Sequence, residues 1–450
     1  MFTTWRSYLS ETHSISFPFA YPVAIALVQL LTGDTPLAAL WLNVFLVALV
    51  WVLCAQQAVR LGVPAFAALV ISTGLLLWPP YVNEAFAGRS MPLAILFLLL
   101  ALASFQVNRH LLGGICLGLA ALTRFDYLPV VVLFIAGVYL LGRRSPKETL
   151  RWVAGALIGA SPWVIYSLLH FGRFWASDNS WVALAAEPAF VTDFPPAAVP
   201  TLFDAPADWV ARVFGNLPAL FSALFTAVKS FPTLPALLVV AVIAVRQVPR
   251  GQLVGGGIAI LLTGASLAPF VLTGYFDQRY FSATLLSSSL VLAAVFAGPA
   301  RPWSQALLAG VLAWVLFDGG GNLVASASAN AKRIRQGTFD RNAAALQAVK
   351  KCHLYHPGST LIFPGAGTST FASRYGAVTG MPSALLPRNF PRMTPEQQQA
   401  YFSFIEPYFL VDSTFEARAC GPAREQQQLQ QQQQQEQQRK AQQQAEQPSS

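Results

Sequence analysis

The stretch that decides the fold is LVISTGLLLWPP-YVNEAFAGRSMP-LAILFLLLALASF, residues 69–105. Its two outer parts are almost pure hydrocarbon and belong to apolar runs of transmembrane length, about 17–25 residues. Between them stand the carboxylate of Glu84 and the guanidinium of Arg89. Burying charged side chains at such a place costs free energy unless they contact water, pair with one another or serve a function. We therefore expect the chain to cross a membrane on both sides of a short charged segment.

The rest of the chain repeats this alternation of apolar runs and short polar segments. Of the 450 residues, 54% are hydrophobic and only 11% are charged, far from the average of a soluble globular protein. The fold class that this predicts is mainly α, a polytopic bundle of about 10–11 transmembrane helices. The candidate spans are residues 37–59, 64–80, 91–107, 111–124, 127–142, 151–170, 231–246, 253–274, 282–299 and 303–318.

The net charge of +9 agrees with a membrane protein. In a soluble protein it would favour nucleic acid as a partner, but here the basic residues stand mostly in short loops between apolar runs. The strongest such loop is GRRSPKETLR, residues 142–151. Placing it in the cytoplasm brings four further basic residues to the same side, namely Arg60, Arg109, Arg246 and Arg301. The predicted partner is the lipid bilayer, and no nucleic acid is expected.

The alternation of apolar runs and polar segments predicts how the first 318 residues are divided. Residues 1–36 are an outward-facing segment or contain a short first helix, because the apolar run 17–31 is short and interrupted by prolines. Residues 37–318 form the membrane domain. Its longest outward segment is the predicted loop 171–230, whose acidic balance fits an outward face.

The C-terminal third has a different composition. Residues 344–352 are typical of an amphipathic helix, and residues 359–365 and 408–413 are typical of short buried strands. Residues 319–424 therefore predict a small extracytoplasmic α/β domain. Residues 425–450 are nearly all glutamine and are expected to be disordered or a fraying helix.

The four cysteines fall into two groups. Cys54 and Cys116 lie inside candidate spans and are interpreted as packing residues. Cys352 and Cys420 lie in the polar C-terminal region and are able to pair if that region is extracytoplasmic. The sequence gives no distance between them, so the disulfide stays open.

Charged residues gather at the outward ends of the spans. They are Glu84, Arg89, Arg124, Asp126, His170, Arg173, Asp178, Asp277 and Arg279. Singly, each has an ordinary explanation: Glu84 and Arg89 as a local ion pair closing a turn, Arg124 as an interfacial anchor. Together they suit a ligand that is half lipid and half phosphate or sugar, because arginine binds phosphate through its planar fork of donors. No metal motif, catalytic triad or phosphate loop appears.

Several stretches, in this order, resemble the GT-C superfamily of membrane glycosyltransferases, which includes protein mannosyltransferases and aminoarabinose transferases. They are residues 81–102, 113–144, 159–178 and 277–294 in the membrane domain, and 371–389 and 408–413 in the C-terminal region. The resemblance covers most of residues 17–415. Each motif is weak alone, and their co-linear order is what carries the likeness.

The resemblance implies a polyprenyl-phosphate sugar as donor, a glycan, lipid or protein as acceptor, and inversion at the anomeric carbon. It implies a bacterial inner membrane with the C-terminal domain in the periplasm. Glu84 is the implied catalytic residue, and six residues are implied to bind the lipid phosphate and sugar: Arg89, Arg124, Asp126, His170, Arg279 and Tyr280. A carboxylate would take the acceptor proton or hold a divalent cation such as Mg²⁺ or Mn²⁺. The metal requirement stays open.

One feature of the family is missing. Its members usually begin with a transmembrane helix and an outward loop that carries an acidic motif, whereas Glu11 is the only carboxylate before Asp34. Three explanations stay open: a start site placed too late, a non-catalytic member, or a catalytic role for Glu84 or Glu11. A non-catalytic protein that binds lipid-linked glycan or partners another enzyme is the main alternative. A secondary transporter is a weaker one, because no internal repeat is seen.

Overall fold

The computed structural model is predominantly helical, and the chain forms two compact units. One unit consists of residues 15–191 and 199–331, and the other of residues 1–14, 192–198 and 332–450. The structure describes residues 19–32, 35–86, 88–141, 145–172, 174, 206–231, 233–244, 248, 260, 264, 267–274, 276–296, 302–335, 360–363, 383–385, 390–404 and 408–410. The predictions for Glu11, residues 344–352, Cys352, Cys420 and the Gln-rich tail fall outside these residues.

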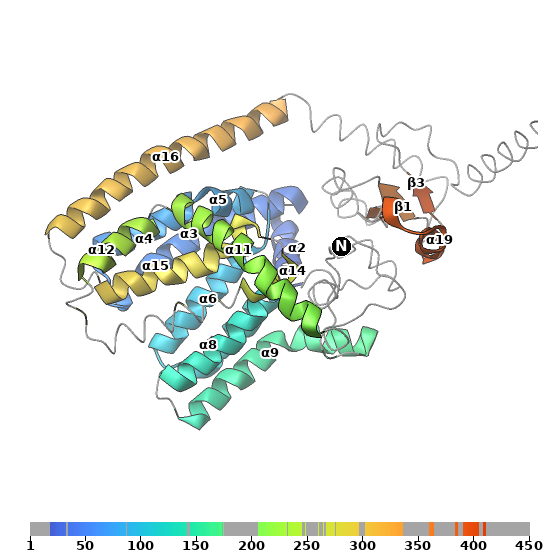
Figure 1. The fold of residues 1–450 in the computed structure, drawn as a ribbon, viewed down its shortest axis with the longest axis horizontal. Helices are drawn as coiled ribbons and strands as arrows, with labels where there is room; N and C mark the ends of the chain where they lie inside the picture. Colours follow the sequence, from blue (N-terminus) through green and yellow to red (C-terminus); the bar gives the residue numbers. More distant parts are fainter. Residues whose placement is uncertain are drawn as a thin grey trace, which may run out of the picture. The chain divides into compact units, whose positions relative to one another are not determined.

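The first unit is a helical bundle (Figure 1). Its helices are α2 (Ala20–Thr32), α3 (Thr35–Arg60), α4 (Ala65–Leu77), α5 (Pro79–Phe86), α6 (Met91–Gln106), α7 (His110–Thr123), α8 (Leu128–Leu141), α9 (Pro146–Phe171), α11 (Pro206–Ser230), α12 (Thr233–Ala244), α14 (Ala268–Thr273), α15 (Ser282–Phe296) and α16 (Pro302–Arg335). Two short 3₁₀ helices, η1 (Phe125–Tyr127) and η4 (Gln278–Phe281), precede α8 and α15.

Three of these helices are long and apolar enough to cross a membrane. They contain Trp41–Arg60, Pro146–Leu169 and Pro206–Ser230, and the bent pair α4 and α5 makes four if it counts as one span. Six further apolar helices are shorter, with 10–17 residues. The structure thus confirms a mainly helical chain with several helices able to cross a membrane. The predicted number of ten or eleven spans stays a prediction.

The helices alternate in direction, so that Glu84 marks one end of the bundle. At this Glu84 end, Ser282 at the start of α15 donates a hydrogen bond to Met91 at the start of α6, with 2.9 Å between Oγ and Sδ. At the opposite end, Trp152 in the second turn of α9 donates to His110 at the start of α7, with 3.2 Å between Nε1 and Nδ1. Four basic residues lie at helix ends on this opposite side, as the charge pattern predicts: Arg60, Arg109, Lys147 and Arg151.

Two helices of the bundle, α7 and α9, run side by side in the same direction and touch through glycines. A Cβ atom placed on Gly114 would overlap the carbonyl oxygen of Trp152, and one on Gly118 would overlap that of Ala156. Gly155 and Gly159 face the same contact from α9. Small residues spaced four apart let two helix backbones approach closely. Such contacts are common between helices in membranes, where the hydrophobic effect does not drive association.

Within the predicted span 64–80, helix α4 ends at Leu77 and the helical geometry breaks at Trp78. Trp78 is extended, with φ −66° and ψ 120°, as expected for a residue before proline. Pro79 and Pro80 then open a new helix, α5, which is bent by 60° from α4. Glu84 therefore lies on a helix, where the sequence predicted an outward loop.

The basic loop 142–151 is also shorter than predicted, because α9 begins at Pro146. Ser145 caps this helix by accepting from the backbone N–H of Glu148, and the Glu148 side chain accepts from the backbone N–H of Ser145. This reciprocal pair is the capping box.

Replacing Ser145 with alanine is expected to lower the free energy of unfolding by about 1 kcal/mol, because the N–H of Glu148 loses its partner. Chemical denaturation in detergent measures the change. Ser161→Ala is the matched control, since the Ser161 hydroxyl is exposed and bonds only to the carbonyl of Ile158 within its own helix. Equal stability of the two variants would contradict the assignment of the cap.

The prediction that residues 171–230 form a loop is wrong over α11, which occupies Pro206–Ser230. Treating the whole segment as one loop concealed a helical periodicity of apolar residues. The contacts of α11 lie at the Glu84 end: Asn216 donates to the carbonyl of Val271, and the Ser230 hydroxyl accepts from the indole N–H of Trp78. The helix therefore crosses this end of the bundle (Figure 1).

Helix α16 continues through the glycines 319–321 to Arg335, past the predicted domain boundary between residues 318 and 319. In the second unit, the predicted strands at 359–365 and 408–413 are confirmed as β1 (Thr360–Phe363) and β3 (Tyr408–Leu410). A third strand, β2 (Ser383–Leu385), was not predicted, and the three pair in parallel in the order β2-β1-β3. Helix α19 (Pro395–Phe404) precedes β3.

Candidate functional site

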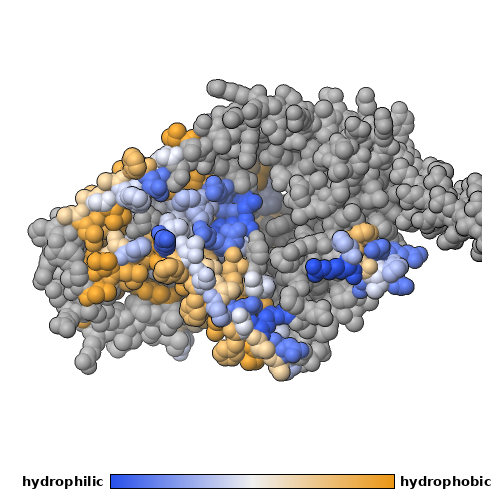
Figure 2. All heavy atoms as spheres, turned by 45° about the horizontal axis from the view of Figure 1, so that its top comes forward, coloured by the Kyte–Doolittle hydropathy of each residue, from blue (hydrophilic) through white to orange (hydrophobic). Residues whose placement is uncertain are grey.

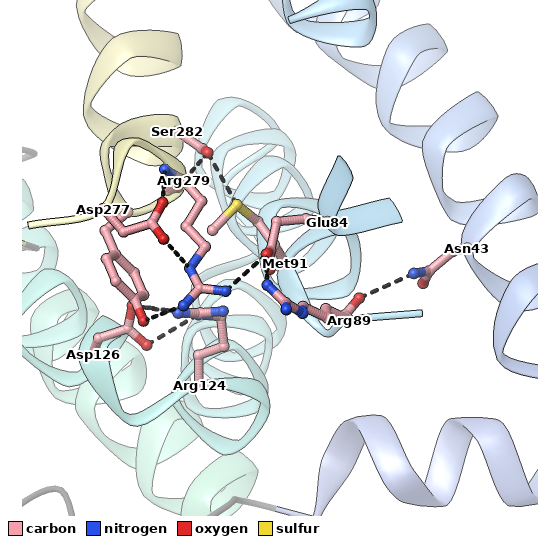
Figure 3. Close-up of polar contacts among 10 residues, drawn as sticks. Asn43, Glu84, Arg89, Met91, Arg124, Asp126, Asp277, Arg279 and Ser282 are labelled. Atoms are coloured by element: carbon pink, nitrogen blue, oxygen red, sulfur yellow. Dashed lines mark hydrogen bonds and ion pairs between the residues drawn. The ribbon is translucent and has the colours of Figure 1, made fainter. Parts of the chain in front are cut away.

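Glu84 is the centre of a group of charged residues at the Glu84 end (Figure 3). Its side chain is 3% exposed, and its Oε1 atom accepts from two arginines. The Nη1 atom of Arg89 lies 2.6 Å away and that of Arg279 lies 3.1 Å away. The second oxygen, Oε2, is also buried and has no hydrogen-bond partner among the residues that the structure describes. Glu84 therefore joins α5 to η4, which is 195 positions further along the chain.

The second carboxylate of the group is Asp277, which holds Arg279 in place. Its Oδ1 atom accepts from the backbone N–H of Arg279 at 3.1 Å and so caps η4. Its Oδ2 atom lies 3.3 Å from the Nε atom of the same arginine. The guanidinium of Arg279 thus lies between two carboxylates, with Glu84 on its other side (Figure 3).

The fourth ion pair joins Arg124 and Asp126, which both follow the end of α7. The Nε and Nη2 atoms of Arg124 donate to the two oxygens of Asp126 at 3.0 and 3.1 Å, a bidentate arrangement. Both side chains are mostly buried. Arg124 is extended, with φ −153° and ψ 123°, so the helix stops and the chain turns into η1.

Tyr280 connects this pair to Arg279. The guanidinium carbon atoms of Arg279 and Arg124 lie 4.9 and 5.3 Å from the centre of its ring, within the range of cation–π attraction. Its hydroxyl accepts from Nη2 of Arg279 at 3.1 Å. Phe270 of α14 stacks on the ring, with 4.0 Å between centroids. We call Glu84, Arg89, Arg124, Asp126, Asp277, Arg279 and Tyr280 the charged cluster.

The charged cluster is formally neutral, with three guanidiniums and three carboxylates, and each guanidinium has a carboxylate partner. Neutralisation in pairs is how buried charges are retained at low cost. Within the described part of the chain, no group of three or more histidine, cysteine, aspartate or glutamate residues is arranged to hold a metal ion.

A residue that the sequence reasoning missed, Asn43, positions this cluster. It is buried in α3, and its Nδ2 atom donates to the carbonyls of Ala85 at 2.9 Å and Arg89 at 3.1 Å. Its Oδ1 atom accepts from the hydroxyl of Tyr21 at 3.0 Å. Between the two carbonyls lies Gly88, whose φ of +66° suits glycine. Asn43 therefore fixes the turn that sets Arg89 beside Glu84.

Asn43→Ala is expected to lower the free energy of unfolding by about 3 kcal/mol, because two buried carbonyls and one hydroxyl lose their partner. Unfolding in detergent measures the change. Asn83→Ala is the control, since Asn83 lies on the adjoining α5 but is exposed. A variant of Asn43 as stable as the Asn83 variant would contradict the positioning role.

Of the predicted site residues, the structure brings together Glu84, Arg89, Arg124, Asp126, Arg279 and Tyr280. His170 lies in the last turn of α9, and its side chain is outside what the structure describes. Asp277, named with the outward charges but not among the predicted site residues, belongs to the cluster. Two ordinary explanations were given from the sequence: a local ion pair of Glu84 with Arg89, and an interfacial anchor at Arg124. They describe only part of the contacts, because Glu84 also pairs with Arg279 and Arg124 pairs with Asp126.

Comparisons with known proteins identified no relative of this chain. No protein-family model, no curated protein and no solved structure matches this chain.

Proposed function

We propose that the chain is an integral-membrane glycosyltransferase that moves a sugar from a polyprenyl-phosphate donor to an acceptor, with the chemistry at the charged cluster. The observation that carries the proposal is the buried carboxylate of Glu84, which has one oxygen held between two arginines and the other without a partner in the described part of the chain. The likeness of the sequence to the GT-C superfamily supports the same reading.

The two oxygens of Glu84 suit two tasks. Oε1 fixes the guanidiniums of Arg89 and Arg279 at one place, where they would bind the phosphate of the donor. Oε2 is free to accept a hydrogen bond from an acceptor hydroxyl or amine and to take its proton as the group attacks the anomeric carbon. The bond from the anomeric carbon to the phosphate oxygen then breaks, and the negative charge on the leaving phosphate is stabilised by the arginines.

Arg89 is the residue best suited to meet an incoming phosphate. Its side chain is 52% exposed, whereas that of Arg279 is 20% exposed and that of Arg124 is 14% exposed. Arg279 would stay in place between Asp277 and Glu84, and Tyr280 would offer its ring and hydroxyl to the sugar. A divalent cation at Glu84 is disfavoured by the two guanidiniums already in contact with that carboxylate.

The location belongs to the same proposal. The Glu84 end and a small C-terminal α/β domain would lie on the outer, periplasmic side of a bacterial inner membrane, with some ten spans in the bundle. The basic residues at the opposite end, Arg60, Arg109, Lys147 and Arg151, support this orientation.

The test is transfer of a radiolabelled sugar from polyprenyl phosphate by the purified chain in lipid vesicles. Transfer to a hydroxyl- or amine-bearing acceptor is the expected result. The absence of transfer with every polyprenyl-phosphate sugar and acceptor tried, from protein shown to be folded, would contradict the proposal.

A second candidate is a non-catalytic protein that binds lipid-linked glycan. It is favoured by the internal pairing of all three arginines of the cluster, which leaves none of them without a carboxylate. This candidate predicts that polyprenyl-phosphate sugar raises the melting temperature of the protein while no sugar is transferred. The first candidate predicts both effects.

A further inference from the structure

The lengths of the helices differ in a way that places the charged cluster relative to a membrane. Helices α4, α6, α7, α8 and α15 have 13–16 residues and all begin or end beside the cluster. At 1.5 Å per residue they are about 20–24 Å long. The hydrocarbon core of a bilayer is about 30 Å thick. A helix of about 20–24 Å that begins at one surface of the hydrocarbon core therefore ends before it reaches the other surface.

Two helices continue past the cluster. The ring of Trp163 in α9 lies 4.9 Å from that of Phe125, which follows Arg124, so Trp163 marks the level of the cluster on α9. The helix goes on from there to Phe171, a further distance of about 12 Å. On α3, the same level is marked by Asn43, and the helix begins at Thr35, again about 12 Å away.

The parts of these helices that extend beyond the cluster expose apolar side chains. Leu168 and Leu169 on α9 are exposed, the latter by 76%. On α2, which pairs with the first part of α3, Leu27, Leu30 and Leu31 are exposed, the last by 88%. Such side chains at the ends of two separate helices are unfavourable in water.

Helix α11 shows the same pattern at the level of the cluster itself. Its outer side carries Phe214, Phe221 and Phe225, each at least 62% exposed. Apolar surface is also widespread on the face of the bundle in Figure 2. A helix that crosses the end of the bundle at an aqueous surface would be expected to turn polar residues outward.

The polar first turns of α9 set the position of the opposite membrane surface. Lys147, Glu148 and Arg151 are followed by an apolar segment from Trp152 to Phe171. That segment is about 30 Å long, which is the thickness of the hydrocarbon core. Trp163, and the cluster with it, then lies about 12 Å below the surface near Phe171.

From these observations we infer that the charged cluster lies within the hydrocarbon depth of the membrane, about 12 Å below the surface, and that acyl chains of the bilayer cover the exposed apolar sides of α2, α9 and α11. The pairing of all six charges agrees with this position, because unpaired charges are costly there. The turn before α6 agrees as well, since the carbonyls of Ala85 and Arg89 accept hydrogen bonds from Asn43 of α3. The inference concerns depth and does not depend on the reaction proposed above.

The test is a depth profile along α9 in phosphatidylcholine vesicles. Single cysteines at the exposed positions Leu150, Leu157, Ile165 and Leu169 are spin-labelled, and the accessibility of each label to oxygen and to a water-soluble nickel chelate is compared. The full chain is used, with its four native cysteines replaced by serine or alanine.

The expected centre of the bilayer is midway between Trp152 and Phe171, so the labels at Leu157 and Ile165 should be equally deep. The label at Leu169 should be protected from nickel, and the label at Leu150 should be exposed to it. A steady rise in nickel accessibility from Leu157 through Ile165 to Leu169 would overturn the inference, because it would place the cluster at the water surface.

A second series on α3 keeps the test decisive if an α9 variant does not fold. Labels at the exposed positions Trp41, Phe45 and Val52 report the same depth from a different helix. The inference requires Phe45, which is one turn or less from Asn43, to be protected from nickel. A label at Phe45 that is as accessible to nickel as Leu150 would overturn it.

Discussion

Gly118→Leu is expected to leave no folded protein at room temperature. The new side chain would start at a Cβ atom that overlaps the carbonyl oxygen of Ala156 and lies 2.8 Å from the backbone nitrogen of Ala160 and from the Cα atom of Gly159. These are backbone atoms of a helix, which cannot rotate away as a side chain can. The two helices would have to separate along their whole contact, at a cost of more than about 4 kcal/mol. Size-exclusion chromatography and thermal unfolding in detergent measure the effect.

Gly310→Leu is the matched control. Gly310 also lies within an apolar helix, α16, but a Cβ atom there meets nothing within 4 Å. This variant should be as stable as the unmodified chain or slightly more stable, because leucine favours a helix more than glycine does. Gly118→Leu protein with unchanged melting temperature would contradict the close contact of α7 and α9.

Glu84→Gln is expected to lower the free energy of unfolding by about 3 kcal/mol, because Arg279 is left in a mostly buried place with Asp277 as its remaining carboxylate partner. Arg89 contributes less to this cost, since its side chain is 52% exposed whereas that of Arg279 is 20% exposed. Equilibrium unfolding in detergent measures the change.

A double-mutant cycle makes this prediction sharper. Removing both charges with Glu84→Gln and Arg279→Gln should cost less than the sum of the two single changes, because the second change removes the charge that the first left unpaired. Glu396→Gln is the control: this residue is exposed, and hydrogen bonds from its own backbone and Thr394 lower its pKa. Additive single and double changes would mean that Glu84 and Arg279 do not interact.

The approach of Glu84 and Arg279 could be predicted in part from the sequence. The alternation of spans and the basic loops put both residues on one side of the membrane, although they are 195 positions apart. The contact itself could not be predicted, because it depends on the 60° bend after Trp78. The signal for that bend was present in the two prolines, which we interpreted as the end of a span and not as the start of another helix.

Two other features show where sequence reasoning failed. Asn43 is an amide in the apolar first half of α3, and a polar residue at such a place signals a buried hydrogen bond. Which groups it bonds follows only from the fold. In α11, the position of residues 171–230 between two candidate spans suggested a loop, while the apolar residues Phe214, Phe221 and Phe225 recur at helical spacing. Treating the whole segment as one loop concealed that local period.

The measurement that tests the central claim most directly compares sugar transfer by the unmodified chain, Glu84→Gln and Glu396→Gln in the same vesicles. Rates are normalised to folded protein and taken well below the melting temperature of the least stable variant. Transfer by Glu84→Gln is predicted to fall about 10³-fold, the contribution of a general base, while Glu396→Gln transfers at the unmodified rate. An unmodified rate in folded Glu84→Gln protein would contradict the claim that the charged cluster is the catalytic site.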